Sequence, residues 1–304
     1  MLSQKILSAF LLPSLLGLFI ARLGAETALD TAAIETITGL KGTRIEAEGV
    51  FKVASPRKDV PVTVDGWKLP PFMGLTSWAA FKADDKAGAM VMGDLVLFED
   101  EVNPVMSAAL DHGLAVTALH NHFFFDQPRV YFMHIGGEGS SADLAKGVKA
   151  TLTTVAQIRA DNPELAKRFT GPALPAESAI TAPALEGVFS AKGQVNAGMV
   201  KFVFGRETTM ECGCTVGKEM GVNTSAVFAG TDDNALVDGD FAATDGELQS
   251  VLKSLRASDI NIVAIHQHMS GETPRIVFLH YWGRGPAADL AKAIKTALAT
   301  QATK

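Results

Sequence analysis

Six of the seven histidines in this 304-residue chain form two sets with the same internal spacing. The first set is His120, His122 and His134, and the second, 146 residues later, is His266, His268 and His280. Three neutral imidazoles on one face can bind a divalent transition metal and leave one coordination position open. The spacing therefore predicts one metal site in each set, with zinc and copper as the first candidates.

A β-hairpin would bring the three histidines of one set together. Side chains two apart on a strand share a face, so His120 and His122 point the same way. If residues 126–128 form the hairpin loop, His120 lies opposite His134 and Phe132 lies opposite His122. Apolar residues surround the histidines in the sequence, among them Phe124. We therefore expect buried, neutral imidazoles.

Two aspartates and two cysteines are further candidates. Asp94 and Asp240 each follow a glycine in an expected strand, and could be a fourth ligand, a group that orients a histidine, or a general base. A carboxylate that caps a turn is the alternative. Cys212 and Cys214 have no counterpart in the first half of the chain. They could bind a soft ion such as Cu(I), or be two small buried apolar residues.

The histidine sets belong to a longer internal repeat. Residues 92–152 align without gaps with residues 238–298, and 20 of the 61 aligned positions are identical. This similarity predicts a tandem duplication, with a first unit over residues 26–160 and a second over residues 184–304. Residues 161–183 contain four prolines and are expected to be the linker.

Each unit has the pattern of an α+β domain. In the first, we expect strands over 89–97, 114–125 and 129–135, a turn at 126–128, and helices over 99–112 and from residue 140. Further strands precede these elements, for example at 60–64 and 77–82. The β-α-β-β-α order favours an antiparallel sheet with its helices on one face.

The N-terminus and the composition bear on location and partners. Lys5, an apolar run over 6–20 and a small-residue tail ending at Ala25 predict a secretory signal peptide over residues 1–25, with an uncleaved anchor as the alternative. A later transmembrane stretch is not expected, and neither is a lipid anchor, because the leader has no cysteine. The net charge of −6 argues against nucleic-acid binding. These features predict a periplasmic or secreted protein.

The chain resembles the LppY/LpqO family of exported bacterial proteins with a duplicated domain. The resemblance rests on matching segments in both halves: Gly93-Asp94, His120-Asn121-His122, Pro128-Arg129, His134, His266-Gln267-His268 and Pro274-Arg275. It implies export and a two-copy design, although this leader lacks a lipid-attachment cysteine. It implies no particular reaction.

Two functional hypotheses follow from the sequence. The first is an exported protein that binds a metal ion in each unit, either as a carrier or as a metal-dependent hydrolase with water at the open position. The second is a non-metal protein of the cell envelope that binds a small molecule, or is structural, and whose histidines form hydrogen bonds.

Overall fold

The computed structural model describes residues 29–166 and 171–301. The expected signal peptide, residues 1–25, lies outside the described residues. Among the described helices, none combines the length and the apolarity needed to cross a bilayer.

The first copy has six strands of the main sheet and three helices. In chain order these are α1 (Thr31–Thr38), β1 (Gly42–Ile45), β2 (Val50–Pro56), β5 (Thr76–Asp84), β6 (Gly88–Phe98), α2 (Val102–Asp111), β7 (Ala115–His120), β9 (Val130–Gly139) and α3 (Ser141–Asp161). A small three-stranded sheet stands apart and consists of β3 (Thr63–Val64), β4 (Trp67–Lys68) and β8 (Asp126–Gln127).

The second copy repeats this plan. Its elements are α4 (Ala182–Phe189), β10 (Gln194–Asn196), β11 (Met199–Gly205), β14 (Asn223–Gly230), β15 (Ala235–Thr244), α5 (Leu248–Ala257), β16 (Asn261–His266), β17 (Ile276–Gly285) and α6 (Ala287–Ala299). The strands β12 (Thr208–Thr209) and β13 (Thr215–Val216) form its small sheet. Two short 3-10 helices, Glu46–Glu48 and Lys218–Met220, complete the described elements.

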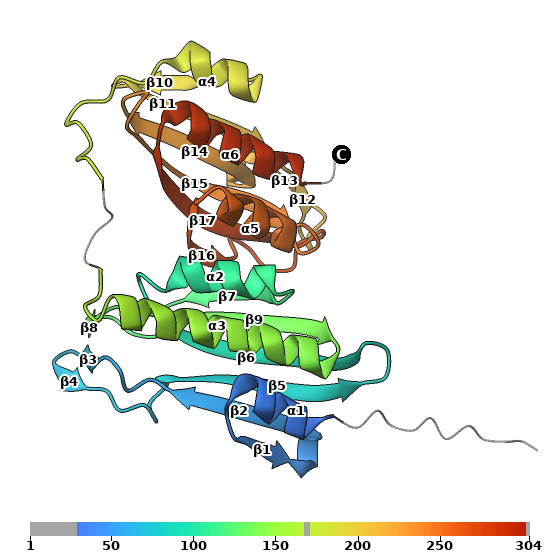
Figure 1. Cartoon of the computed structure of the whole chain (residues 1–304). Coiled ribbons are helices and arrows are strands. Elements are labelled where there is room, and N and C mark those ends of the chain that lie inside the picture. Colours follow the sequence, from blue (N-terminus) through green and yellow to red (C-terminus); the bar gives the residue numbers. More distant parts are fainter. Residues whose placement is uncertain (1–28, 167–170, 302–304) are drawn as a thin grey trace, which may run out of the picture.

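Both copies contribute to one antiparallel sheet of twelve strands. The strand order is β1-β2-β5-β6-β9-β7-β16-β17-β15-β14-β11-β10, so the copies meet where β7 lies beside β16. Figure 1 shows the strands in this order, with α2 and α5 side by side at the junction. The structure confirms the α+β class, with helices over an antiparallel sheet, and it shows equivalent elements in both halves.

Alternation along the strands separates the core from the histidines. Leu95, Leu119 and Met133 point toward the helices and are buried in the main core. Their neighbours Asp94, His120 and His134 therefore point to the opposite face of the sheet. The helices cover only one face, so the candidate site residues lie on the face that the helices leave open.

Equivalent side-chain amides close the junction between the copies. The Asn103 side chain accepts a hydrogen bond from the Ile262 N–H (2.8 Å) and donates one to the Ile262 carbonyl (3.2 Å). Gln249, the equivalent residue of α5, makes the same pair of bonds to Val116 (2.9 and 2.8 Å). Only Leu119 and Ile265 pair directly between β7 and β16. The amides therefore satisfy backbone groups that the divergent strands leave unpaired.

We expect Gly239→Ala to destabilise the protein. A Cβ at Gly239 would lie 2.0 Å from the Ser225 carbonyl oxygen and 2.6 Å from the hydroxyl of the buried Tyr281. The closer contact is to a backbone oxygen, which cannot rotate away as a side chain can. The free energy of unfolding should therefore fall by at least the ~1–3 kcal/mol of ordinary overpacking. Denaturation monitored by circular dichroism measures the effect. Gly136→Ala is the control, since its Cβ would meet only the Val91 carbonyl, at 3.6 Å. Equal stability of the two variants would refute the expectation.

Candidate metal centre

Equivalent positions in the two copies supply the candidate ligands. The aspartate lies in the long strand β6 or β15, and the third histidine lies directly across from it in β9 or β17. The first histidine ends β7 or β16, and the second follows two residues later. The structure therefore brings each aspartate next to its histidine set.

The hairpin register differs from the one expected from the sequence. His120 lies opposite Phe132, and His134 lies opposite Ala118, because residues 121–129 connect β7 to β9 in place of the expected three-residue turn. The expected strand over 114–125 also ends early, at His120. The chain then leaves the main sheet and pairs with β3 through Asp126 and Gln127. The expectation that His120 faces His134 directly is wrong.

The first histidine set nevertheless converges along a diagonal. The Nε2 atoms of His120 and His134 are 3.0 Å apart. The rings of His120 and His122 stack with centroids 5.2 Å apart. Asp94 is paired with His134 across the sheet. Four potential ligands of the first copy therefore share one small area of the open face.

The second set is arranged around Asp240. Its Oδ2 lies 3.0 Å from His268 Nε2, and its Oδ1 lies 3.6 Å from His266 Nε2 and 3.7 Å from His280 Nδ1. Ligand atoms of Asp240, His266 and His268 all lie within 4.8 Å of one another. A single carboxylate thus contacts all three imidazoles of the second copy.

The imidazoles are more exposed than the sequence suggested. The exposed fractions are 35% for His266, 33% for His268 and 53% for His280. Phe124, expected to lie beside buried histidines, is 87% exposed. The prediction of burial fails because the loop after β7 departs from the sheet at the histidines. The small cores on this face cover Phe132 and Phe278 but leave the imidazoles partly exposed.

In each copy, a buried phenylalanine ring stacks against the second histidine of the set. Phe132 stacks against His122 at 3.3 Å between ring centroids, and Phe278 stacks against His268 at 3.5 Å. Both phenylalanines are fully buried. Each ring therefore holds an imidazole that lies outside the regular strand.

Burial and neighbouring charges both shift the pKa values of the candidate ligands. Burial raises the pKa of Asp94, although the neighbouring histidines His134, His122 and His120 oppose this. Burial and the adjacent His120 lower the pKa of His122, and burial lowers the pKa of His266 against the attraction of Asp240. Lower histidine pKa values favour the neutral imidazole, which is the form that binds metals.

The donor geometry fits a cation. Within residues 29–166 and 171–301, the Oδ1 atoms of Asp94 and Asp240 are buried and accept no hydrogen bond. Such atoms are rare in proteins and call for a partner. Two ligands of a tetrahedral zinc ion lie about 3.3 Å apart for bonds of about 2.0–2.1 Å. The 3.0 Å separations of His120 from His134 and of His268 from Asp240 are close to this spacing.

Comparison with known proteins identifies a family. A family model described as Domain of Unknown Function (DUF1259) matches residues 32–154 and again residues 183–300. The chain belongs to the DUF1259 family. The two matches agree with the internal duplication. No curated protein matches the sequence significantly.

A solved structure that matches this chain resembles it only weakly. A trimeric bacterial microcompartment shell protein, PduB, aligns over 84% of this chain and 88% of its own, with 10% sequence identity and a TM-score of 0.22.

One residue pair near the sites was not singled out from the sequence. Gly74 and Gly221 occupy equivalent loops of the two DUF1259 copies and have positive φ angles of 96° and 85°. A Cβ at these positions would lie 3.9 Å from His122 Nδ1 and 3.8 Å from His268 Nδ1. The shared Met-Gly dipeptide of the repeat was the available signal.

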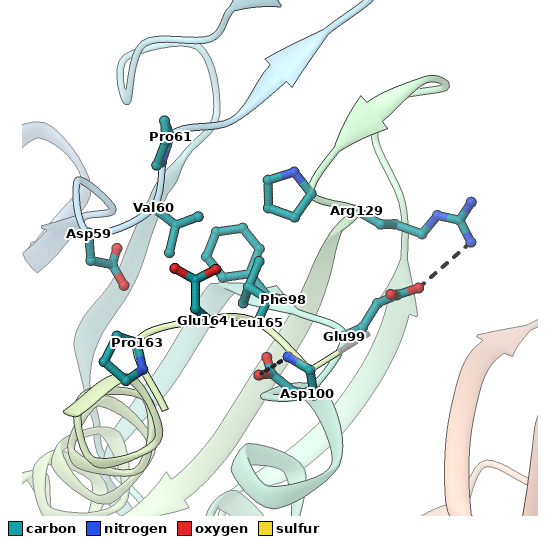
Figure 2. Close-up of a pocket in the computed structure, with 12 residues that line it drawn as sticks. Asp59, Val60, Pro61, Phe98, Glu99, Asp100, Arg129, Pro163, Glu164 and Leu165 are labelled. Carbon is teal, nitrogen blue, oxygen red and sulfur yellow. Dashed lines mark hydrogen bonds and ion pairs between the residues drawn. The ribbon is translucent and has the colours of Figure 1, made fainter. Parts of the chain in front are cut away.

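Cys212, Cys214 and Arg129 lie outside the ligand group of the second copy. Cys212 and Cys214 are both exposed, so the alternative of two buried apolar residues is wrong. Arg129 pairs with Glu99 at 3.8 Å, on the exterior. Figure 2 shows this pair beside a cavity of about 640 Å³, into whose space Asp59 and Glu164 project.

A second cavity of about 640 Å³ lies between the two DUF1259 copies. Its walls include Asn103 and Tyr131 from the first copy and Arg256, Asn261 and Trp282 from the second. Neither cavity is lined by a histidine. The partly exposed imidazoles of His266, His268 and His280 are open to solvent at the surface of the sheet.

Proposed function

We propose that this protein is an exported metal-binding protein that holds one divalent transition-metal ion in each copy. The ligands would be Asp94, His120, His122 and His134 in the first copy, and Asp240, His266, His268 and His280 in the second. One observation carries the proposal: Asp240 lies within 3.7 Å of all three imidazoles of its set, and the equivalent residues of the first copy gather around the 3.0 Å contact of His120 with His134.

Hydrogen bonding among the histidines explains the geometry less well than a bound metal ion does. The Nε2 atoms of His120 and His134 face each other at 3.0 Å, and only one of them can carry the proton of a hydrogen bond. That arrangement leaves the buried Oδ1 of Asp94 without a donor. A cation between these groups would satisfy all of them, and Zn²⁺ and Cu²⁺ both accept nitrogen and oxygen ligands.

The ligand set is consistent with either transport or catalysis. One carboxylate and three neutral imidazoles would leave a net charge of about +1 at a divalent ion, which favours an anionic ligand or substrate. Access from solvent would allow water at any open position, as in metal-dependent hydrolases. Membership of the LppY/LpqO group and export to the periplasm or beyond form part of the same proposal.

A second candidate function rests on the cavity between the copies. Its walls combine the aromatic Tyr131 and Trp282 with Arg256 and three acidic residues, Glu99, Asp100 and Asp259, a lining that suits a small organic ligand with an apolar part and polar groups. In that case the protein would be a ligand-binding protein of the envelope, and its histidines would be structural.

Elemental analysis of purified protein separates the two functions. We expect two ions per chain in the wild-type protein, one in each copy. Each of the single variants, His120→Ala and His266→Ala, should hold one ion per chain. The double variant should hold none. His112→Ala is the matched control, because His112 lies outside both sets and contacts only the Ala108 carbonyl through its ring (2.8 Å). Absence of metal after incubation with zinc, copper, nickel and manganese salts would reject the proposal and favour the cavity.

A further inference from the structure

The two copies differ most clearly beside the histidine sets. In the second copy, residues 210–214 form the turn between β12 and β13 and end with Cys212-Gly213-Cys214. In the first copy, Asp65 and Gly66 form the turn between β3 and β4. Both turns belong to small sheets that attach to the loop after the second histidine, through Thr63–Gln127 and Thr209–Thr273.

The second-copy turn has a defined conformation. The Met210 N–H donates to the Cys214 carbonyl (2.9 Å), and the Gly213 N–H donates to the Met210 carbonyl (2.8 Å). Gly213 has a φ of 81°, a left-handed conformation that glycine adopts without strain. The turn thus holds the two cysteine side chains near each other.

The two cysteines lie two residues apart, on either side of Gly213, and face solvent. Both side chains are exposed and carry no disulfide. An incoming ion would therefore meet two neighbouring sulfur donors without a change of fold.

We propose that Cys212 and Cys214 form a separate site for a soft monovalent cation, Cu(I). Binding would release one proton from each thiol and form two sulfur–copper bonds, with no change in oxidation state. Thiolates select soft ions. Zinc would require about four ligands, and among the described residues no other histidine, cysteine or acidic side chain joins the pair in a three-ligand group.

The site would lie at the edge of the second histidine set. Met210, which begins the turn, packs with Met269 against the small core that contains Phe278. Phe278 in turn stacks on His268. The first copy has the two-residue turn Asp65-Gly66 in place of residues 210–214 and no cysteine there, so the proposal assigns the soft site to the second copy alone.

The test is Cu(I) binding in competition with a chromogenic Cu(I) chelator, on anaerobically reduced full-length protein. We expect one Cu(I) per chain to bind through the thiols, and at least a tenfold weaker affinity in Cys212→Ser/Cys214→Ser. The His120→Ala/His266→Ala variant should keep this Cu(I), which separates the site from the proposed histidine sites. Unchanged far-ultraviolet circular dichroism would show that the serine variant is folded.

Two outcomes would overturn the proposal. The first is equal Cu(I) affinity in the wild-type and the double-serine proteins. The second is a Cys212–Cys214 disulfide, seen as the absence of reactive thiols, in protein isolated from the periplasm without a reductant.

Discussion

Replacing Glu101 with alanine should lower the free energy of unfolding by about 3–5 kcal/mol, the usual cost of breaking a buried ion pair. Glu101 is fully buried at the start of α2 and accepts hydrogen bonds from Arg57 (2.7 and 2.9 Å). It also accepts one from the Phe98 N–H (2.9 Å), and Arg159 Nε lies 2.9 Å away. Without the carboxylate, two largely buried guanidinium groups would lose their shared counter-charge.

Urea denaturation of the two matched glutamate variants measures this effect. Glu99→Ala should cost less than about 1 kcal/mol, because Glu99 is 56% exposed and its pairing with Arg129 is a surface ion pair. Glu101→Gln keeps the size of the side chain and removes the charge, and should also be strongly destabilising. A loss below about 1 kcal/mol for Glu101→Ala would mean that the ion cluster adds little stability.

Replacing Asp94 or Asp240 with asparagine should weaken metal binding at its own site by at least about 100-fold, beyond the upper end for residues that only orient a ligand. Asp240 contacts all three imidazoles of its set and supplies the only formal negative charge among the four proposed ligands. Asparagine keeps the shape but cannot neutralise a divalent ion. The affinity of the other site should remain unchanged.

Titration with Zn²⁺ against a fluorescent chelator separates the two sites in these variants. Asp238→Asn is the matched control, because Asp238 is an exposed carboxylate two residues away on the same face of β15. Its affinity should stay within about twofold of wild type, as expected for a solvent-screened charge. If Asp238→Asn and Asp240→Asn weakened binding equally, Asp240 would act only through long-range attraction.

The repeat and the local elements could be predicted from the sequence, because they depend on short-range patterns. The α+β class follows from alternating apolar residues and turn signals, and the two histidine sets follow from their spacing. The helix expected from Glu99 begins at Val102, and Glu101, at its N-cap position, makes no side-chain capping hydrogen bond. The Glu101 carboxylate binds Arg57 instead, 44 residues earlier, and no local pattern reveals such a partner.

The geometry of the site was less predictable for a similar reason. The register of the hairpin depends on the connection over residues 121–129, which is longer than the turn expected at 126–128. The exposure of the histidines depends on where residues 121–127 go, and this is decided by their pairing with β3. The single sheet shared by both copies depends on the contacts of Asn103 and Gln249, which lie in different halves of the chain.

The junction between the copies has the form of a symmetric homodimer within one polypeptide. Leu119 meets Ile265, its own equivalent, and Asn103 and Gln249 exchange identical bonds, which is the reciprocity of an isologous interface. In a true homodimer every substitution appears twice. Fusion of the two halves removes that restriction, so a Cys-Gly-Cys turn can stand in one half of this molecule without a counterpart in the other.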